Sequence, residues 1–184
     1  MNSPFGVDPG TLTEARMLCH VACQWPSKAA RANLAAEEDD GHSNLGWRGE
    51  HNGLLSRFLD GGRRYQLGFS FSAGSLIWLA ANEVESRLAL RHETEASAKD
   101  WVDNHLAEAS LNATDHAVMP YELEYEARYA RLAQLENAVS ALGAWYEYGQ
   151  RGLENLVSAS RDLSVVPPTV RCWPHHFDLG ALFA

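Results

Sequence analysis

Apolar side chains alternate strictly with polar or small ones along residues 65–72, which read YQLGFSFS. A period of two residues predicts a β-strand with one face on a core and the other toward a wetter surface. Turn signals flank this segment, so we expect antiparallel neighbours at Leu54 to Leu59 and at Ser75 to Ala80. Phe69 lies at the centre of the strand, and we expect its side chain to be buried. Weaker patterns extend the meander at both ends: Ser43 to Arg48 and Ser86 to His92.

Before this meander, apolar residues recur every three or four positions, which predicts a helix. Thr11 and Glu14 have the spacing of a capping box, so the helix is expected to begin there. Pro26 has no backbone N–H group and is expected to kink or end this segment, after which helix resumes toward Leu34. The stretch from Glu37 to Asp40 is expected to be an acidic, solvated loop.

After the meander the helical period returns. Thr94 is expected to cap one helix, and a longer helix is expected from about Glu124, with Gly149 and Gly152 as its candidate breaks. The sequence Val166-Pro167-Pro168 is expected to stop helix, and the chain beyond it is expected to be extended. This order of elements predicts an α+β fold: a largely antiparallel sheet of about five or six strands packed by helices, one of them long.

Length and composition limit the class of protein. A chain of 184 residues that is 46% hydrophobic is long enough for one domain with a core, so we expect a single domain over residues 1–184. The formal charge of −9 repels phosphate backbones and anionic lipids, which disfavours nucleic acid and membranes as partners. Three cysteines cannot all pair within one chain, and the first residues do not read as an export signal. We therefore expect a bacterial cytoplasmic protein.

The densest chemistry lies in the terminal stretch Arg171 to Ala184, which reads RCWPHHFDLGALFA. If this stretch is a strand, alternation places His176 and Asp178 next to each other on one face. A carboxylate beside an imidazole suits a general-base pair or a divalent metal site, so these two are candidate catalytic residues. If the chain turns after Pro174 instead, His175 and His176 converge. The competing interpretation is structural, with these side chains hydrogen-bonded and inert.

A catalytic metal site needs at least three protein ligands in most arrangements. The candidate ligands are His175, His176 and Asp178 of the terminal box, together with His42 at a loop-to-strand junction. His20, on the flank of the first helix, is the next candidate. Zinc or iron is the expected divalent transition metal, because imidazole and carboxylate ligands suit both. A solvated loop histidine and a helix-packing histidine are the ordinary alternatives for His42 and His20.

The sequence PHHFDLG, Pro174 to Gly180, resembles the PHHFDLA-type or SFDLA-type box of a family of uncharacterised bacterial proteins. The segment His42 to Trp47, HSNLGW, is similar to a histidine-bearing segment that ends in tryptophan in the same family. The resemblance implies an α+β layout and a shared site at the four candidate metal positions, and it implies no reaction. Members of this family continue past the box into a turn-rich tail, whereas this sequence stops at Ala184.

Two classes of function follow from these observations. The first is a metal-dependent enzyme that acts on a small molecule, with its site built around the PHHFD box. The alternative is a non-catalytic assembly or binding subunit whose PHHFD box is a structural interface. Because the apolar run from Phe177 to Phe183 reaches the end of the sequence, we expect a further segment, a second polypeptide or a second copy of the chain to cover Asp178 to Ala184.

Overall fold

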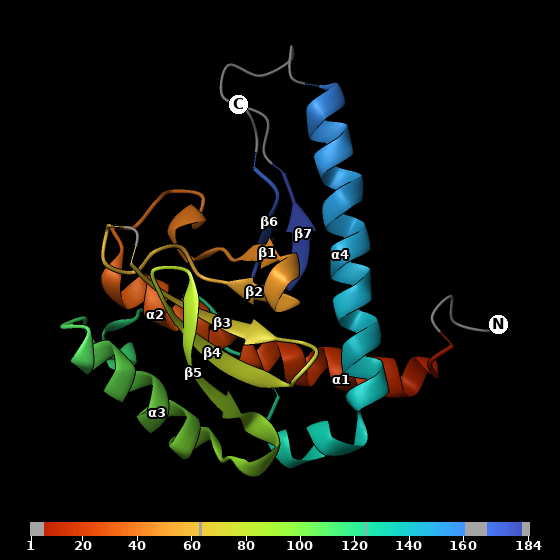
Figure 1. Cartoon of the computed structure of the whole chain (residues 1–184), viewed down its shortest axis with the longest axis horizontal. Helices are drawn as coiled ribbons and strands as arrows, with labels where there is room; N and C mark the ends of the chain where they lie inside the picture. The colour runs from red at the N-terminus through yellow and green to blue at the C-terminus, as the bar shows by residue number, and fades with distance from the viewer. Residues whose placement is uncertain (1–5, 63, 124, 161–168, 182–184) are drawn as a thin grey trace.

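The computed structural model describes residues 6–62, 64–123, 125–160 and 169–181, and within them a five-stranded antiparallel sheet lies at the centre, in the order β1-β2-β3-β4-β5 (Figure 1). Its strands are β1 (Gly46–Arg48), β2 (Gly53–Leu55), β3 (Tyr65–Ser70), β4 (Ser75–Ala80) and β5 (Glu83–Ala89). Helices pack on this sheet, and a two-stranded sheet lies beside it. The fold is therefore α+β, as the sequence predicts.

The hairpin of β3 and β4 confirms the clearest strand prediction. Phe69 of β3 lies opposite Leu76 of β4 and is fully buried in the main core. Every residue of β4 is buried, because its two faces contact different clusters. Trp78 joins Leu76 in the main core, whereas Ile77 and Leu79 belong to a small second cluster.

The first two strands are shorter than the sequence predicts, and β5 begins before Ser86, the predicted start of the fifth strand. β2 ends at Leu55, and the predicted strand through Leu59 continues as a loop. A 3-10 helix at Gly41–Ser43 replaces the start of the predicted first strand. It follows Asp40, whose φ of 57° is left-handed and incompatible with an extended chain. The end of the predicted fifth strand is likewise a 3-10 helix, Leu90–His92.

In the described ranges the chain forms four α-helices: α1 (Pro9–Ala22), α2 (Gln24–Asn33), α3 (Glu95–Glu108) and α4 (Glu136–Ala159). Asp8 caps α1 in place of the predicted Thr11, because Asp8 Oδ2 accepts a hydrogen bond from the Thr11 N–H at 2.9 Å. The break between α1 and α2 falls at Cys23. Pro26 lies in the first turn of α2, where a missing N–H group costs no helical hydrogen bond.

Thr94 caps α3 as predicted, in a reciprocal pair of hydrogen bonds with Ser97. α4 begins at Glu136, after a 3-10 helix at Tyr129–Gln134, and it continues through the glycines that the sequence marked as candidate breaks. A glycine costs a helix only about 1 kcal/mol, which packing against the rest of the protein offsets. Glu124 itself and the predicted stop at Val166-Pro167-Pro168 lie outside the described residues, but residues 125–128 are irregular, so the predicted start of the long helix at about Glu124 is wrong.

Helix α4 stands beside both sheets and runs along β7 (Figure 1). A β-carbon at Gly143 would lie 2.5 Å from Asn52 Oδ1 and 3.0 Å from Phe71 Cβ, so glycine permits the close approach of α4 to the main sheet. Farther along α4, Tyr148 and Leu156 are exposed. Among the described residues, no helix has both the length and the hydropathy needed to cross a bilayer.

The terminal stretch forms a hairpin of β6 (Arg171–Trp173) and β7 (Asp178–Gly180). Trp173 pairs with Asp178, so the continuous strand expected from Arg171 to Phe183 is wrong and the alternative of a turn after Pro174 is the one observed. Residues 182–184, which include the end of the predicted apolar run, lie outside the described residues. The partner expected over this segment stays a prediction.

Candidate functional site

The PHHF sequence, residues 174–177, forms the turn between β6 and β7, which we name the histidine turn. The N–H groups of His176 and Phe177 both donate to Trp173 O, at 3.2 and 2.8 Å. Phe177 has a φ of 58°, a left-handed conformation that bulky residues rarely adopt. Its ring is buried nonetheless, so packing of the ring holds the backbone in a costly conformation. Contacts from outside the turn therefore determine its shape.

Helices α1 and α2 bind the start of this turn through Pro174 O. His20 Nε2 donates to this oxygen at 2.6 Å, and Gln24 Nε2 donates to it at 3.0 Å. Because a carbonyl oxygen can only accept, the proton of the neutral His20 ring lies on Nε2. Burial lowers the pKa of His20, and the hydrogen bond to Pro174 O opposes this effect. His20 is thus an anchor of the turn, where the sequence ranked it as a further metal candidate.

Helix α4 binds the end of the same turn. Tyr146 donates its hydroxyl hydrogen to Phe177 O at 2.8 Å, and burial raises the pKa of Tyr146, which keeps the hydroxyl protonated. The Phe177 ring lies 5.2 Å from the Tyr146 ring and is stacked on the His20 ring at 5.1 Å. Tyr146 in turn lies 5.3 Å from Phe71, which follows β3. A chain of rings therefore connects the main sheet with the histidine turn.

The turn brings His175 and His176 together. Their ring centres lie 4.2 Å apart, with the planes tilted by 52°. His176 and Asp178 are exposed, and His175 is half-buried. Burial lowers the pKa of His175, the His176 ring lowers it further, and the Asp178 carboxylate opposes both. The face shared by His176 and Asp178 in the strand prediction is absent, because His176 lies in the turn and Asp178 in β7.

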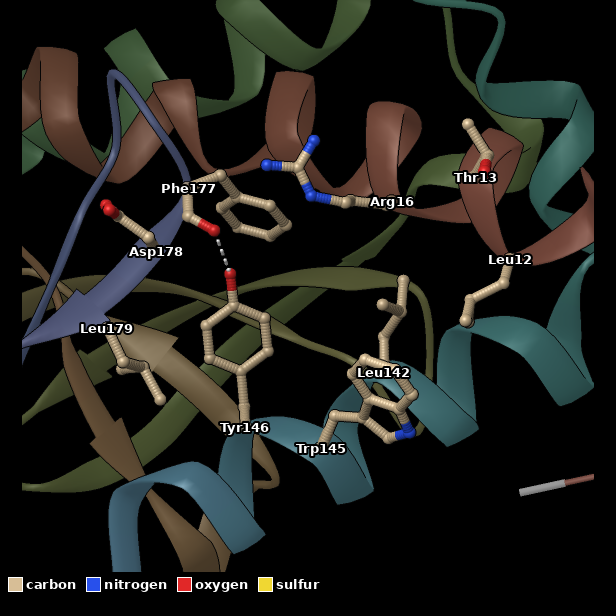
Figure 2. Close-up of a pocket in the computed structure, with 9 residues that line it drawn as sticks. All are labelled: Leu12, Thr13, Arg16, Leu142, Trp145, Tyr146, Phe177, Asp178 and Leu179. Atoms are coloured by element: carbon tan, nitrogen blue, oxygen red, sulfur yellow. Dashed lines mark hydrogen bonds between the residues drawn. The ribbon is translucent and has the colours of Figure 1, made fainter. Parts of the chain in front are cut away.

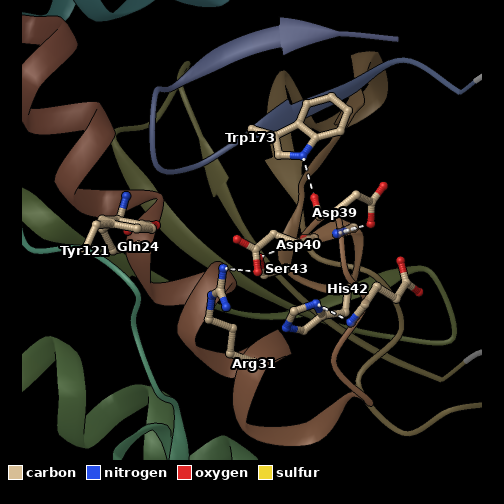
Figure 3. Close-up of polar contacts among 10 residues, drawn as sticks. Gln24, Arg31, Asp39, Asp40, His42, Ser43, Tyr121 and Trp173 are labelled. Atoms are coloured by element: carbon tan, nitrogen blue, oxygen red, sulfur yellow. Dashed lines mark hydrogen bonds and ion pairs between the residues drawn. The ribbon is translucent and has the colours of Figure 1, made fainter. Parts of the chain in front are cut away.

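His42 lies in the 3-10 helix before β1 and is buried. Its Nδ1 accepts a hydrogen bond from the Glu37 N–H at 3.1 Å (Figure 3). Burial lowers the pKa of His42, and the charge of Arg31 lowers it further. Within the described ranges, no three His, Cys, Asp or Glu side chains are arranged to hold a metal ion. The four predicted ligands are therefore not assembled in this arrangement, and the metal site stays a prediction.

The acidic loop before His42 makes contacts with α2 and with β6 that the sequence does not predict. Arg31 of α2, whose side chain is only 8% exposed, pairs with Asp40 at 2.9 Å. Trp173 Nε1 donates to Asp39 O at 3.3 Å, which ties β6 to the same loop (Figure 3). The loop is nevertheless solvated as predicted, because residues 37–39 are exposed and the Asp40 side chain remains 37% exposed in its ion pair. An arginine near the end of a helix that precedes an acidic run was the available signal for this pair.

Tyr121 contacts both Gln24 and His175 beside the histidine turn. Its hydroxyl donates to Gln24 Oε1 at 2.7 Å, and its ring centre lies 5.9 Å from that of His175. Burial raises the pKa of Tyr121 to about 12. Because the Gln24 amide group also donates to Pro174 O, it connects Tyr121 to the turn. These contacts restrain the position of His175 and leave His176 exposed.

A cavity of about 290 Å³ lies between α1, α4 and β7, with the histidine turn as one wall (Figure 2). Arg16 Nη2 donates to His176 O at 2.9 Å, and the guanidinium carbon lies 5.9 Å from the Phe177 ring centre. In Figure 2 the Asp178 carboxylate points away from Tyr146, whereas the Arg16 guanidinium lies near the Phe177 ring. Most of the wall is aliphatic or aromatic; the lining residues are Leu12, Thr13, Arg16, Leu142, Trp145, Tyr146, Phe177, Asp178 and Leu179.

Sequence reasoning missed Arg16, Gln24 and Tyr146 as parts of this site. Arg16, His20 and Gln24 are spaced four residues apart, and all three donate to carbonyl groups of the turn. A polar stripe of this spacing beside the apolar stripe of the first helix was the signal that could have found them. Tyr146 gave no such signal, because its ring fits the apolar stripe of α4.

No model of a known protein family matches the chain, and curated proteins and solved structures give no significant match either. The relation to a family of uncharacterised bacterial proteins, which the PHHFDLG box suggests, stays a prediction. Functional inference therefore depends on the geometry of the histidine turn and of the cavity beside it.

Proposed function

We propose that this protein binds a small, largely apolar molecule in the cavity between α1, α4 and β7. The observation that carries the proposal is the cavity of about 290 Å³, whose wall consists mostly of leucine and aromatic side chains. Ligand sites in proteins are typically concave and mostly apolar, with a few polar groups, and the smallest have volumes of about 300 Å³. The sequence predicts a metal-dependent enzyme that acts on a small molecule or, as the alternative, a non-catalytic assembly or binding subunit. The function proposed here is a binding function, as in the alternative, and its ligand is a small molecule, as in the enzyme hypothesis.

The histidine turn contributes the preformed wall of this site. Phe177 is fixed by stacking on His20 and by the hydrogen bond from Tyr146 to its carbonyl oxygen. A wall that is already ordered loses little conformational entropy when a ligand binds, which favours affinity. We place this activity in the cytoplasm because the cysteines are free and buried, as in reducing compartments: Cys19, Cys23 and Cys172.

A neutral fluorescent probe tests the proposal. N-phenylnaphthylamine emits strongly in apolar surroundings, and we expect its titration to saturate with one bound probe per chain. Leu12→Trp places an indole ring at the cavity wall and should weaken binding by about tenfold, because overfilling a packed space costs roughly 1–3 kcal/mol.

The matched control is Leu156→Trp, the same substitution at an exposed position of α4 that does not line the cavity. We expect this variant to keep the affinity within about twofold, as for distant, independent sites. Circular dichroism confirms that both variants are folded. Probe binding that never saturates, or an equal loss in both variants, contradicts the proposal.

A second candidate function is the metal-dependent enzyme predicted from the sequence, and the contact between His175 and His176 favours it. Two imidazole rings with centres 4.2 Å apart are close enough to share an ion when a nitrogen of each ring faces it, but a third ligand has to come from a side chain that moves or from the substrate. Asp178 is the nearest candidate in sequence.

Elemental analysis of the purified protein tests this second function. We expect stoichiometric zinc or iron, and a loss of about tenfold or more in metal content in His176→Ala and in Asp178→Ala. His116→Ala, at an exposed histidine of the 3-10 helix Thr114–His116 and outside the predicted ligand set, is the matched control and should retain the metal. Metal content that is unchanged in both site variants, or absent from the wild type, contradicts this function.

A further inference from the structure

Arg16 is the only basic side chain among the described residues that line the cavity. Its guanidinium group has five N–H donors, and one of them is occupied by His176 O at 2.9 Å. Arg16 is exposed, and the hydrogen bond and the contact with the Phe177 ring place its guanidinium group beside the turn. Arg16 therefore presents further N–H donors at the cavity.

Arg16 forms no ion pair with any carboxylate of the described residues. Other arginines do pair with carboxylates, such as Arg131 with Glu14 at 2.7 Å and Arg31 with Asp40 at 2.9 Å. Carboxylates are abundant in this chain, whose formal charge is −9. A guanidinium that takes a carbonyl oxygen and a ring face as its neighbours keeps its charge available for an anion.

The other polar groups of the cavity are already satisfied or point elsewhere. Thr13 Oγ1 donates to Pro9 O at 2.9 Å, and the Tyr146 hydroxyl donates to Phe177 O at 2.8 Å. The Asp178 carboxylate points away from Tyr146 in Figure 2. Among the described residues that line the cavity, Arg16 therefore supplies a cation at the edge of an apolar space.

We propose that the ligand of this cavity is a small monocarboxylate with an apolar body, whose carboxylate binds the free N–H groups of Arg16. This inference rests on the proposed function, since it names the class of ligand for the same cavity. A planar carboxylate matches the fork of guanidinium N–H groups. A dianion such as a phosphate monoester fits less well, because one cation faces it and the Asp178 charge lies nearby.

Competition against N-phenylnaphthylamine tests this inference with three probes that share one apolar body: phenylbutyrate, phenylbutyramide and phenylbutylamine. In the wild-type protein we expect phenylbutyrate to bind about tenfold or more tighter than the neutral amide, with the amine weakest. Arg16→Gln should weaken phenylbutyrate by about tenfold and leave the amide within about threefold. Arg16→Lys, which keeps the charge and loses the fork, should fall between the two.

The outcomes separate this inference from the proposed function. If the three probes bind equally, if the amine binds best, if phenylbutyrate fails to bind, or if Arg16→Gln has no effect on phenylbutyrate, the carboxylate class is wrong. The cavity proposal still stands in each of those cases when the neutral probe binds and Leu12→Trp weakens it. Arg16→Gln retains an amide that can donate to His176 O, and thermal unfolding checks that the variant is folded.

Discussion

Phe177→Ala is expected to destabilise the protein by about 3–5 kcal/mol, the usual cost of emptying a phenylalanine site in a core. Phe177 is only 3% exposed, and its ring contacts His20 of α1 and Tyr146 of α4. Removing the ring breaks the chain of aromatic contacts between the main sheet and the histidine turn. Urea denaturation followed by circular dichroism measures the loss, and a value below about 1 kcal/mol contradicts the anchoring role given to this ring.

Phe177→Gly is the control for the backbone at the same position. Glycine and alanine both lack the ring, but only glycine adopts the φ of 58° without steric cost. We therefore expect the glycine variant to be more stable than the alanine variant by about 1 kcal/mol. The reverse order contradicts a left-handed backbone at residue 177 in solution.

Phe69→Ala is expected to have an effect of the same size, about 3–5 kcal/mol. Phe69 is fully buried at the centre of β3, and its ring meets that of Phe71 edge to face at 5.1 Å. Phe69 projects from a strand whose backbone is paired with β2 on one side and β4 on the other, so the backbone can collapse little toward the cavity that the ring leaves. Urea denaturation at neutral pH measures this loss.

Tyr148→Ala is the matched control for Phe69→Ala. Tyr148 is 78% exposed on α4, so removing its aromatic ring should change stability by less than about 0.5 kcal/mol. If the two variants are destabilised equally, or if Phe69→Ala costs less than about 1 kcal/mol, residue 69 does not lie in the core.

The sequence predicts the parts of the fold that short-range patterns determine. Alternation along residues 65–72 predicts β3 and the burial of Phe69, and Thr94 has the chemistry of the cap that it forms. The wetter face expected for β3 is wrong. Gln66 and Ser70 are buried, and they donate to Ser56 O at 2.6 Å and to His51 O at 2.9 Å. Partners from other segments permit this burial of polar groups, and alternation alone does not reveal them.

The histidine turn could be predicted only as an alternative, for a physical reason. Residues 174–177 contain neither glycine nor asparagine, the residues that favour a left-handed backbone, and that conformation falls on Phe177. Donors from α1, α2 and α4 impose the turn, and their positions depend on the whole fold. The convergence of His175 and His176 was foreseen from the sequence, whereas the cavity and the role of Arg16 were not.

An NMR titration that follows backbone amides during addition of N-phenylnaphthylamine tests the central proposal, ligand binding in the cavity, most directly. The proposal predicts saturating shifts that cluster at the cavity wall: residues 12–16 of α1, 142–146 of α4 and 177–179 at the end of the histidine turn. Shifts that fail to saturate, or that cluster around the separate groove lined by Trp25, Met119 and Tyr125, contradict it.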